Sequence, residues 1–160
     1  MSSQPSGQTD EVAERRRSQS EPGTGCEAIL VVDDNARLCD LAKRALSSDG
    51  WIVHIESSRS TALAAAASEP FALALSDYAM PDGDGLLLLS ELDCLQPDCR
   101  LVLWSAAVPA GAARRARELD VTVLPGKLLG KELCAAARAA LAPQAQMRGR
   151  STAGQPGFLG

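Results

Sequence analysis

The sequence predicts an α/β protein built on one parallel sheet with helices on both faces. Two observations carry this prediction. Short apolar runs of the kind that form buried parallel strands recur along the chain, and longer segments with helical or helix-favouring patterns separate them. Five such runs and five such segments fit within 160 residues, a length suited to one domain with tails. The regular alternation favours right-handed crossovers between parallel strands.

The predicted strands are apolar runs bounded by turn residues. They cover residues 27–32, 51–55, 71–76, 100–104 and 121–124. Doubly wound sheets of this size commonly take the strand order 2-1-3-4-5, as in the flavodoxin-like fold. The first and third strands are then neighbours.

Five helices are predicted between and after these strands. The first begins at a cap, Asn35, and ends at Gly50. Its predicted buried face consists of residues at helical spacing, namely Leu38, Leu41, Ala42, Ala45 and Leu46. The other helices are predicted from Ser58 or Ser60 to a stop at Pro70, and over residues 86–95, 110–118 and about 128–141.

Composition and charge narrow the class of protein. A net charge of −4 argues against a nucleic-acid-binding body. The five cysteines form no CxxC pair, and neither a signal sequence nor an apolar run of about 20 residues is present. These features predict a soluble protein of the cytoplasm that does not contact membranes. Residues 1–25 are expected to be a disordered tail, 26–143 the folded domain and 144–160 a flexible tail, with no second domain.

Three acidic residues follow two of the predicted strands. Asp33 and Asp34 end the first strand, and Asp77 ends the third. A single aspartate after a strand is usually a turn residue, but neighbouring parallel strands bring all three to one sheet edge. At about 5 Å and an effective dielectric of about 20, each like-charge pair costs roughly 3 kcal/mol. Either a proton or a divalent cation must then offset the charge, and ligation by oxygen alone suits Mg²⁺.

The segment after Asp77 is predicted to be a shaped loop, because Pro81, Gly83 and Gly85 disfavour a helix there. An acid at a strand tip, presented by a stiff loop, can bind a metal ion or attack a phosphorus atom.

Three motifs together resemble the response-regulator receiver domain of two-component signalling. They are Val-Val-Asp-Asp-Asn at 31–35, Asp-x-x-Met-Pro-x-x-x-Gly at 77–85, and Ser105-Ala106 after the fourth strand. The resemblance covers about residues 27–142 and includes the site itself, so it concerns more than the fold.

The resemblance implies a role for each matching residue. Asp77 is the phosphoacceptor, taking a phosphoryl group from the phosphohistidine of a histidine kinase or phosphotransfer protein. Asp33, Asp34, Asp77 and the backbone carbonyl of Ala79 hold Mg²⁺. Ser105 is the switch residue that hydrogen-bonds the new phosphoryl group. Because no output domain is encoded, a downstream protein is the expected target, and the negative net charge argues against nucleic acid.

The sequence departs from the family pattern at two places. Receiver domains carry a lysine at the end of the fifth strand, but this chain reads Leu-Pro-Gly-Lys at 124–127. Lys127 either reaches the phosphoryl group from a displaced loop or points away, in which case that contact is lost. The family also often has an aromatic residue on the fifth strand, where this chain has Val121 or Val123.

These features leave three hypotheses. The first is a stand-alone receiver that accepts phosphate and signals through protein contacts. It is not expected to be an enzyme, since it promotes only its own Mg²⁺-dependent phosphoryl transfer and hydrolysis. The second is a degenerate receiver, an interaction module independent of phosphorylation, which the missing lysine and aromatic residue favour. The third is a Mg²⁺-dependent phosphatase with an aspartate nucleophile, which would need a second acid where Ala79 stands.

Overall fold

The protein, described here by a computed structural model over residues 27–143, has a central five-stranded sheet. Its strands are β1 (Ala28–Val32), β2 (Ile52–Glu56), β3 (Leu73–Ser76), β6 (Arg100–Leu103) and β7 (Thr122–Val123). All neighbours pair in parallel, in the order β2-β1-β3-β6-β7. Counted along the chain this is 2-1-3-4-5, so the predicted fold class and strand order are confirmed.

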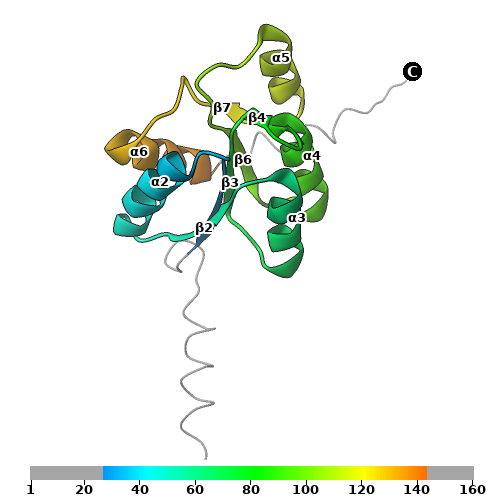
Figure 1. The fold of residues 1–160 in the computed structure, drawn as a ribbon. Helices are drawn as coiled ribbons and strands as arrows, with labels where there is room; N and C mark the ends of the chain where they lie inside the picture. Colours follow the sequence, from blue (N-terminus) through cyan, green and yellow to red (C-terminus); the bar gives the residue numbers. More distant parts are fainter. Residues whose placement is uncertain (1–26, 144–160) are drawn as a thin grey trace, which may run out of the picture.

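Five helices in the described part cover the two faces of this sheet (Figure 1). They are α2 (Ala36–Ser48), α3 (Arg59–Ser68), α4 (Gly85–Leu95), α5 (Ala110–Glu118) and α6 (Gly130–Leu141). Helices α2 and α6 lie on one face, and α3, α4 and α5 on the other. Alternation along β1 divides the core accordingly: Ile29 and Val31 pack on the α2/α6 side, and Leu30 and Val32 on the opposite side.

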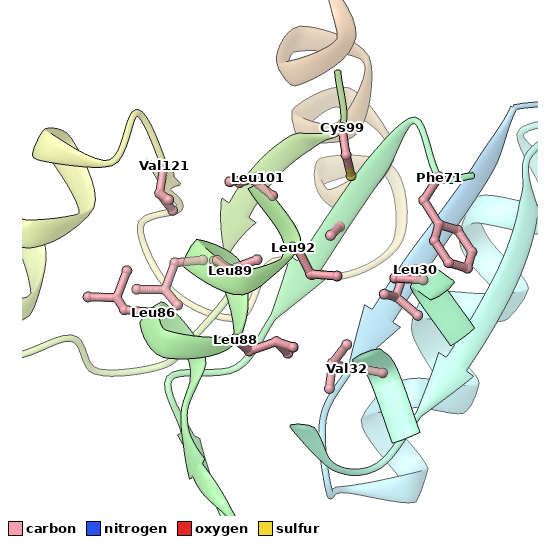
Figure 2. Packing of buried hydrophobic residues seen from close by; sticks show 14 of the residues in the cluster. Leu30, Val32, Phe71, Leu86, Leu88, Leu89, Leu92, Cys99, Leu101 and Val121 are labelled. Carbon is pink, nitrogen blue, oxygen red and sulfur yellow. The ribbon is translucent and has the colours of Figure 1, made fainter. Parts of the chain in front are cut away.

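The leucine-rich helix α4 is pressed onto the sheet. Leu86, Leu88, Leu89 and Leu92 are at most 1% exposed and share one buried cluster with the sheet residues Leu30, Val32 and Leu101 (Figure 2). Each fully buried leucine contributes about 1.5–3 kcal/mol. With so few aromatic side chains in the sequence, these leucines supply much of the core on this face.

The buried face of α2 differs from the predicted one. Cys39, Ala42 and Leu46 are buried, whereas Leu41 is 41% exposed. The predicted and the observed buried residues both have helical spacing. The observed set, at positions i, i+3 and i+7, begins at Cys39. The small thiol fits under the strand end, where Cys39 Sγ donates to the carbonyl of Asp33 at 3.2 Å. The prediction for Leu41 was wrong because the sequence pattern gave a cysteine too little weight as an apolar residue.

The loop after Asp77 contains a small antiparallel pair that was not predicted. Strand β4 (Ala79–Met80) pairs with β5 (Gly83–Asp84), and the turn between them holds Pro81 and Asp82. The loop is therefore more regular than expected, although it is not helical, as predicted.

Several expectations lie partly or wholly outside the described residues. The predicted tails at 1–25 and 144–160 do so, and so does Cys26. Of the cysteines within 27–143, Cys39, Cys94 and Cys134 are free thiols. None of the helices in this range is long and apolar enough to cross a membrane.

Candidate functional site

The three predicted acids meet at the carboxyl edge of the sheet. Strands β1 and β3 are paired with Val32 opposite Ser76, so Asp33 and Asp77 follow directly from neighbouring positions. The backbone N–H of Asp77 donates to Val32 O at 2.9 Å, which fixes this alignment. Carboxylate oxygens of Asp33, Asp34 and Asp77 all lie within 4.8 Å of one another. The parallel topology thus gathers acids that are 44 residues apart in the sequence.

The acids sit in different surroundings. Asp33 is 2% exposed, and its Oδ1 accepts the backbone N–H of Asn35 at 2.9 Å. Asn35 in turn caps α2, accepting from Arg37 N at 3.1 Å and Leu38 N at 3.2 Å. The helix cap therefore also fixes the turn that holds Asp33. Asp34 is exposed to solvent, and the side chain of Asp77 is 16% exposed.

The ammonium of Lys127 lies among these acids. Lys127 Nζ forms an ion pair with Asp33 Oδ2 and lies 3.5 Å from Asp77 Oδ1. Its side chain is only 15% exposed. Of the two possibilities that the sequence left open, the structure has the lysine reaching inward from the loop after β7. One ammonium against three ionised carboxylates leaves two negative charges, which a divalent cation would match.

The other predicted site residues lie on adjacent strand ends. Ser105 is 6% exposed and follows β6, and its hydroxyl donates to Ala107 O at 3.3 Å. Within residues 27–143, the structure shows no hydrogen bond from Ser105 to the acids. Ala79 is the first residue of β4, two positions past Asp77, and is exposed.

A close backbone approach fixes the loop of Asp77. Gly85 N donates to Tyr78 O at 2.6 Å, and a Cβ at Gly85 would lie 1.9 Å from Asp77 O. The hydroxyl of Ser76 also donates to Asp77 O, at 2.9 Å. Only glycine lets α4 begin this close to the acid, so sterics require Gly85 at the first position of the helix.

The same loop is tied to α3 through Asp82. The two carboxylate oxygens of Asp82 accept the backbone N–H groups of Arg59 at 2.9 Å and Ser60 at 3.0 Å, in the first turn of the helix. These hydrogen bonds lower the pKa of Asp82 below its ordinary value of 3.8. Arg59 also forms a bidentate ion pair with Glu91 on α4, which raises the pKa of the Arg59 guanidinium. The loop after Asp77 is thus tied to α3, which in turn is tied to α4.

We expect Asp82→Ala to lower the urea midpoint of unfolding at pH 7, because two N–H groups at the start of α3 lose their acceptor. A depressed folded-state pKa stabilises the fold above the unfolded value and loses that effect as pH falls through the folded one. The difference from wild type should therefore shrink below about pH 4. Asp82→Asn, which keeps one acceptor oxygen, should lose less. Equal midpoints for all three proteins at pH 7 would contradict this role.

Sequence reasoning missed the buried neighbours of the site. Burial raises the pKa of the Cys39 thiol to about 11, so this cysteine remains a neutral packing residue beside Asp33. The sequence predicts only that Trp104 ends a strand, whereas in the structure its ring lies beneath the Lys127 ammonium. Nothing in the sequence distinguishes either residue from an ordinary core position. The helix-capping role of Asp82 was also missed, because its partners lie 22 and 23 residues away.

Comparison with known proteins places this arrangement in a family. The family model of the response regulator receiver domain matches residues 29–129. The transcriptional regulatory protein ZraR of Salmonella typhimurium is 32% identical over 100 residues, covering 61% of this chain and 23% of that protein. The photosynthetic apparatus regulatory protein RegA of Cereibacter sphaeroides is 35% identical over 95 residues, covering 59% of this chain and 52% of RegA. The chain thus matches about a quarter to a half of the length of these relatives.

Solved structures agree on the fold. A CheY-like receiver domain from Methanospirillum hungatei JF-1 superposes with a TM-score of 0.69 at 24% identity, covering 77% of this chain and 99% of that one. Three observations support the same family: the strand order of the sheet, the acids at its carboxyl edge, and the family match over 29–129. This chain belongs to the response regulator receiver domains of two-component systems.

Proposed function

We propose that Asp77 is the phosphoacceptor of this receiver, taking a phosphoryl group from the phosphohistidine of a histidine kinase or phosphotransfer protein in a Mg²⁺-dependent reaction. The observation that carries the proposal is the placement of Asp77 within 4.8 Å of Asp33 and Asp34, beside the Lys127 ammonium. Such a site can both activate an oxygen nucleophile and offset the charge of an incoming phosphoryl group.

The carboxylate of Asp77 is held for attack. One oxygen, Oδ1, accepts the backbone N–H of Tyr78 at 2.9 Å and faces Lys127. Its second oxygen has no hydrogen bond or ion pair within residues 27–143. That oxygen would form the new O–P bond while the N–P bond of the phosphohistidine breaks and the imidazole leaves with a proton. The product is an acyl phosphate on Asp77.

The donor set fits Mg²⁺. Asp33, Asp34 and Asp77 offer only oxygen atoms, and the exposure of Asp34 leaves room for the waters that Mg²⁺ retains. These side chains would hold the ion, together with the backbone carbonyl of Ala79. When bound, the ion would supply charge neutralisation and alignment of the phosphoryl oxygens.

Lys127 and Ser105 would respond to the transfer. Lys127 Nζ, already 3.5 Å from Asp77, can pair with a phosphoryl oxygen through a charge-assisted hydrogen bond worth about 1.5–3 kcal/mol. Ser105 would exchange its hydrogen bond to Ala107 O for one to the phosphoryl group, which would pull the loop after β6 inward. The altered surface would then signal by contact with a downstream protein.

One observation favours the degenerate-receiver alternative. Residues 121–124, which include β7, are Val, Thr, Val and Leu. No aromatic side chain is therefore present there to follow the movement of Ser105. Phosphorylation at Asp77 could then occur without the movement of an aromatic residue that would signal it. The phosphatase alternative lacks its general acid, because Ala79 has no titratable side chain.

The test is incubation of the protein with acetyl phosphate, with and without MgCl₂, followed by intact mass spectrometry. We expect one phosphoryl group per chain with Mg²⁺ and none when EDTA replaces it. An unmodified mass under both conditions would support the degenerate receiver instead. The free thiols of Cys39, Cys94 and Cys134 fit the reducing cytoplasm, where we propose that the donor acts.

A further inference from the structure

Lys127 is held in an unusual way for a site lysine. It extends from the loop after β7 rather than from a strand, and a lysine side chain is flexible. The loop itself turns sharply at Gly126, whose φ of 113° is accessible mainly to glycine. Gly126 N donates to Leu124 O at 2.8 Å, and Leu128 N donates to Gly126 O at 3.1 Å. These local bonds shape the loop, but they do not direct the lysine side chain toward the acids.

A single buried side chain contacts both the loop and the ammonium. Trp104 is fully buried, and its indole Nε1 donates to Leu128 O at 2.9 Å. The face of the same indole lies beneath Lys127, with Nζ 4.1 Å from the ring centroid. An ammonium over an indole face at this distance is attracted by the ring, and more strongly where water is excluded. The Lys127 side chain, at 15% exposure, meets that condition.

The backbone of Trp104 is also linked to the phosphoacceptor strand. Trp104 N donates to Ser76 O at 2.8 Å, directly before Asp77. The indole therefore stands on a frame that includes β3 and β6. The loop of Lys127 is attached to this frame at both ends, by Leu124 N donating to Leu103 O at 3.0 Å and by Leu128 O accepting from the indole. Movement of the loop relative to Asp77 would break both the indole hydrogen bond and the ring contact.

We propose that Trp104 is a positioning residue, which holds the displaced Lys127 ammonium within reach of Asp33 and Asp77 and so restores the contact that a strand-borne lysine would make. This role rests on the proposed phosphoacceptor function, because the ammonium matters to transfer only if Asp77 is phosphorylated. Trp104 itself touches no reacting atom. It acts through Lys127.

The contact can be tested without any phosphorylation. The chain has two tryptophans, so Trp51→Phe leaves Trp104 as the only emitter of indole fluorescence. In that background, Lys127→Met should change the intensity of Trp104 emission, because a neighbouring ammonium quenches indole. Lys131→Met, an exposed lysine on α6, is the matched control and should not change it. Unchanged emission in the Lys127 variant, with unchanged far-UV circular dichroism, would overturn the proposal.

The functional arm is a double-mutant cycle on the initial rate of phosphoryl uptake from acetyl phosphate with MgCl₂. We expect Trp104→Leu to slow uptake about tenfold in a chain with Lys127, and to have little further effect in a Lys127→Met chain. Trp104→Phe, which keeps a ring face but loses the N–H, should slow uptake less than Trp104→Leu. If the Trp104→Leu variant does not fold, the Trp104→Phe variant can replace it in the same cycle.

An equal slowing with and without Lys127 would show a purely structural role and overturn the proposal. If the wild type takes up no phosphoryl group, the proposed function itself fails, and with it the role in transfer. A fluorescence change in the Lys127 variant would then show that the contact exists without serving transfer, which separates the two failures.

Discussion

Asp77→Asn should abolish phosphoryl uptake from acetyl phosphate while leaving the fold intact. The amide offers no anionic oxygen to attack phosphorus, and it also removes one of the carboxylates that would hold Mg²⁺. We expect uptake at least about a thousandfold slower than that of the wild type, which is a loss typical of removing a nucleophile. The measurement is the time course of intact mass in the presence of MgCl₂.

The fold should tolerate this change. Two carboxylates within 4.8 Å repel each other by roughly 3 kcal/mol at an effective dielectric of about 20, so removing one charge offsets the lost contact with Lys127. The unfolding midpoint of Asp77→Asn should therefore be no lower than that of the wild type. Asp93→Asn, on the exposed side of α4, is the matched control and should be phosphorylated normally. Normal uptake by Asp77→Asn would refute the assignment of the phosphoacceptor.

The second large effect is expected for Gly85→Ala. The added Cβ would lie 1.9 Å from Asp77 O and 2.9 Å from Ser76 Oγ, so the backbone at the start of α4 must shift. Overpacking of this kind costs about 1–3 kcal/mol, and a clash with backbone belongs at the upper end. For a domain of this size we expect the melting temperature to fall by about 10 °C. Phosphoryl uptake should fall as well, because the atom that must move belongs to Asp77.

Gly111→Ala is the matched control for this prediction. Gly111 also lies in the first turn of a helix, α5, but a Cβ there would meet nothing within 4 Å. Replacing glycine with alanine at such a position stabilises by about 0.4–1 kcal/mol. Thermal unfolding should thus change in opposite directions for the two variants. A melting temperature of Gly85→Ala equal to that of the wild type would show that the close approach to Asp77 O is not a constraint.

The sheet was predictable because its signals are local. Each strand is a compact apolar run, and the acids that end β1 and β3 stand next to those runs in the sequence. Once the strand order is known, the meeting of Asp33, Asp34 and Asp77 follows from topology alone. The cap at Asn35 was likewise local, and the structure has its side chain accepting two backbone N–H groups of α2.

Features that depend on distant packing were not predictable. The direction of Lys127 depends on the turn at Gly126 and on the indole of Trp104, which come from different segments. The clash that requires Gly85 depends on how close α4 begins to Asp77. The spacing of residues in the sequence does not indicate this distance. The exposure of Leu41 was missed for a related reason, since two overlapping helical stripes were possible and packing selected the one with Cys39.

The most direct test of the phosphoacceptor site is to locate the phosphoryl group itself. Borohydride converts an aspartyl phosphate into homoserine, and tandem mass spectrometry of the tryptic fragment 60–100 would identify the converted residue. That fragment carries Asp77 together with Asp82, Asp84, Asp93 and Asp98, so it includes its own internal controls. Homoserine at position 77 alone is the predicted result. Homoserine at one of the other four aspartates, or a borohydride-resistant phosphate on serine or threonine, would contradict the account.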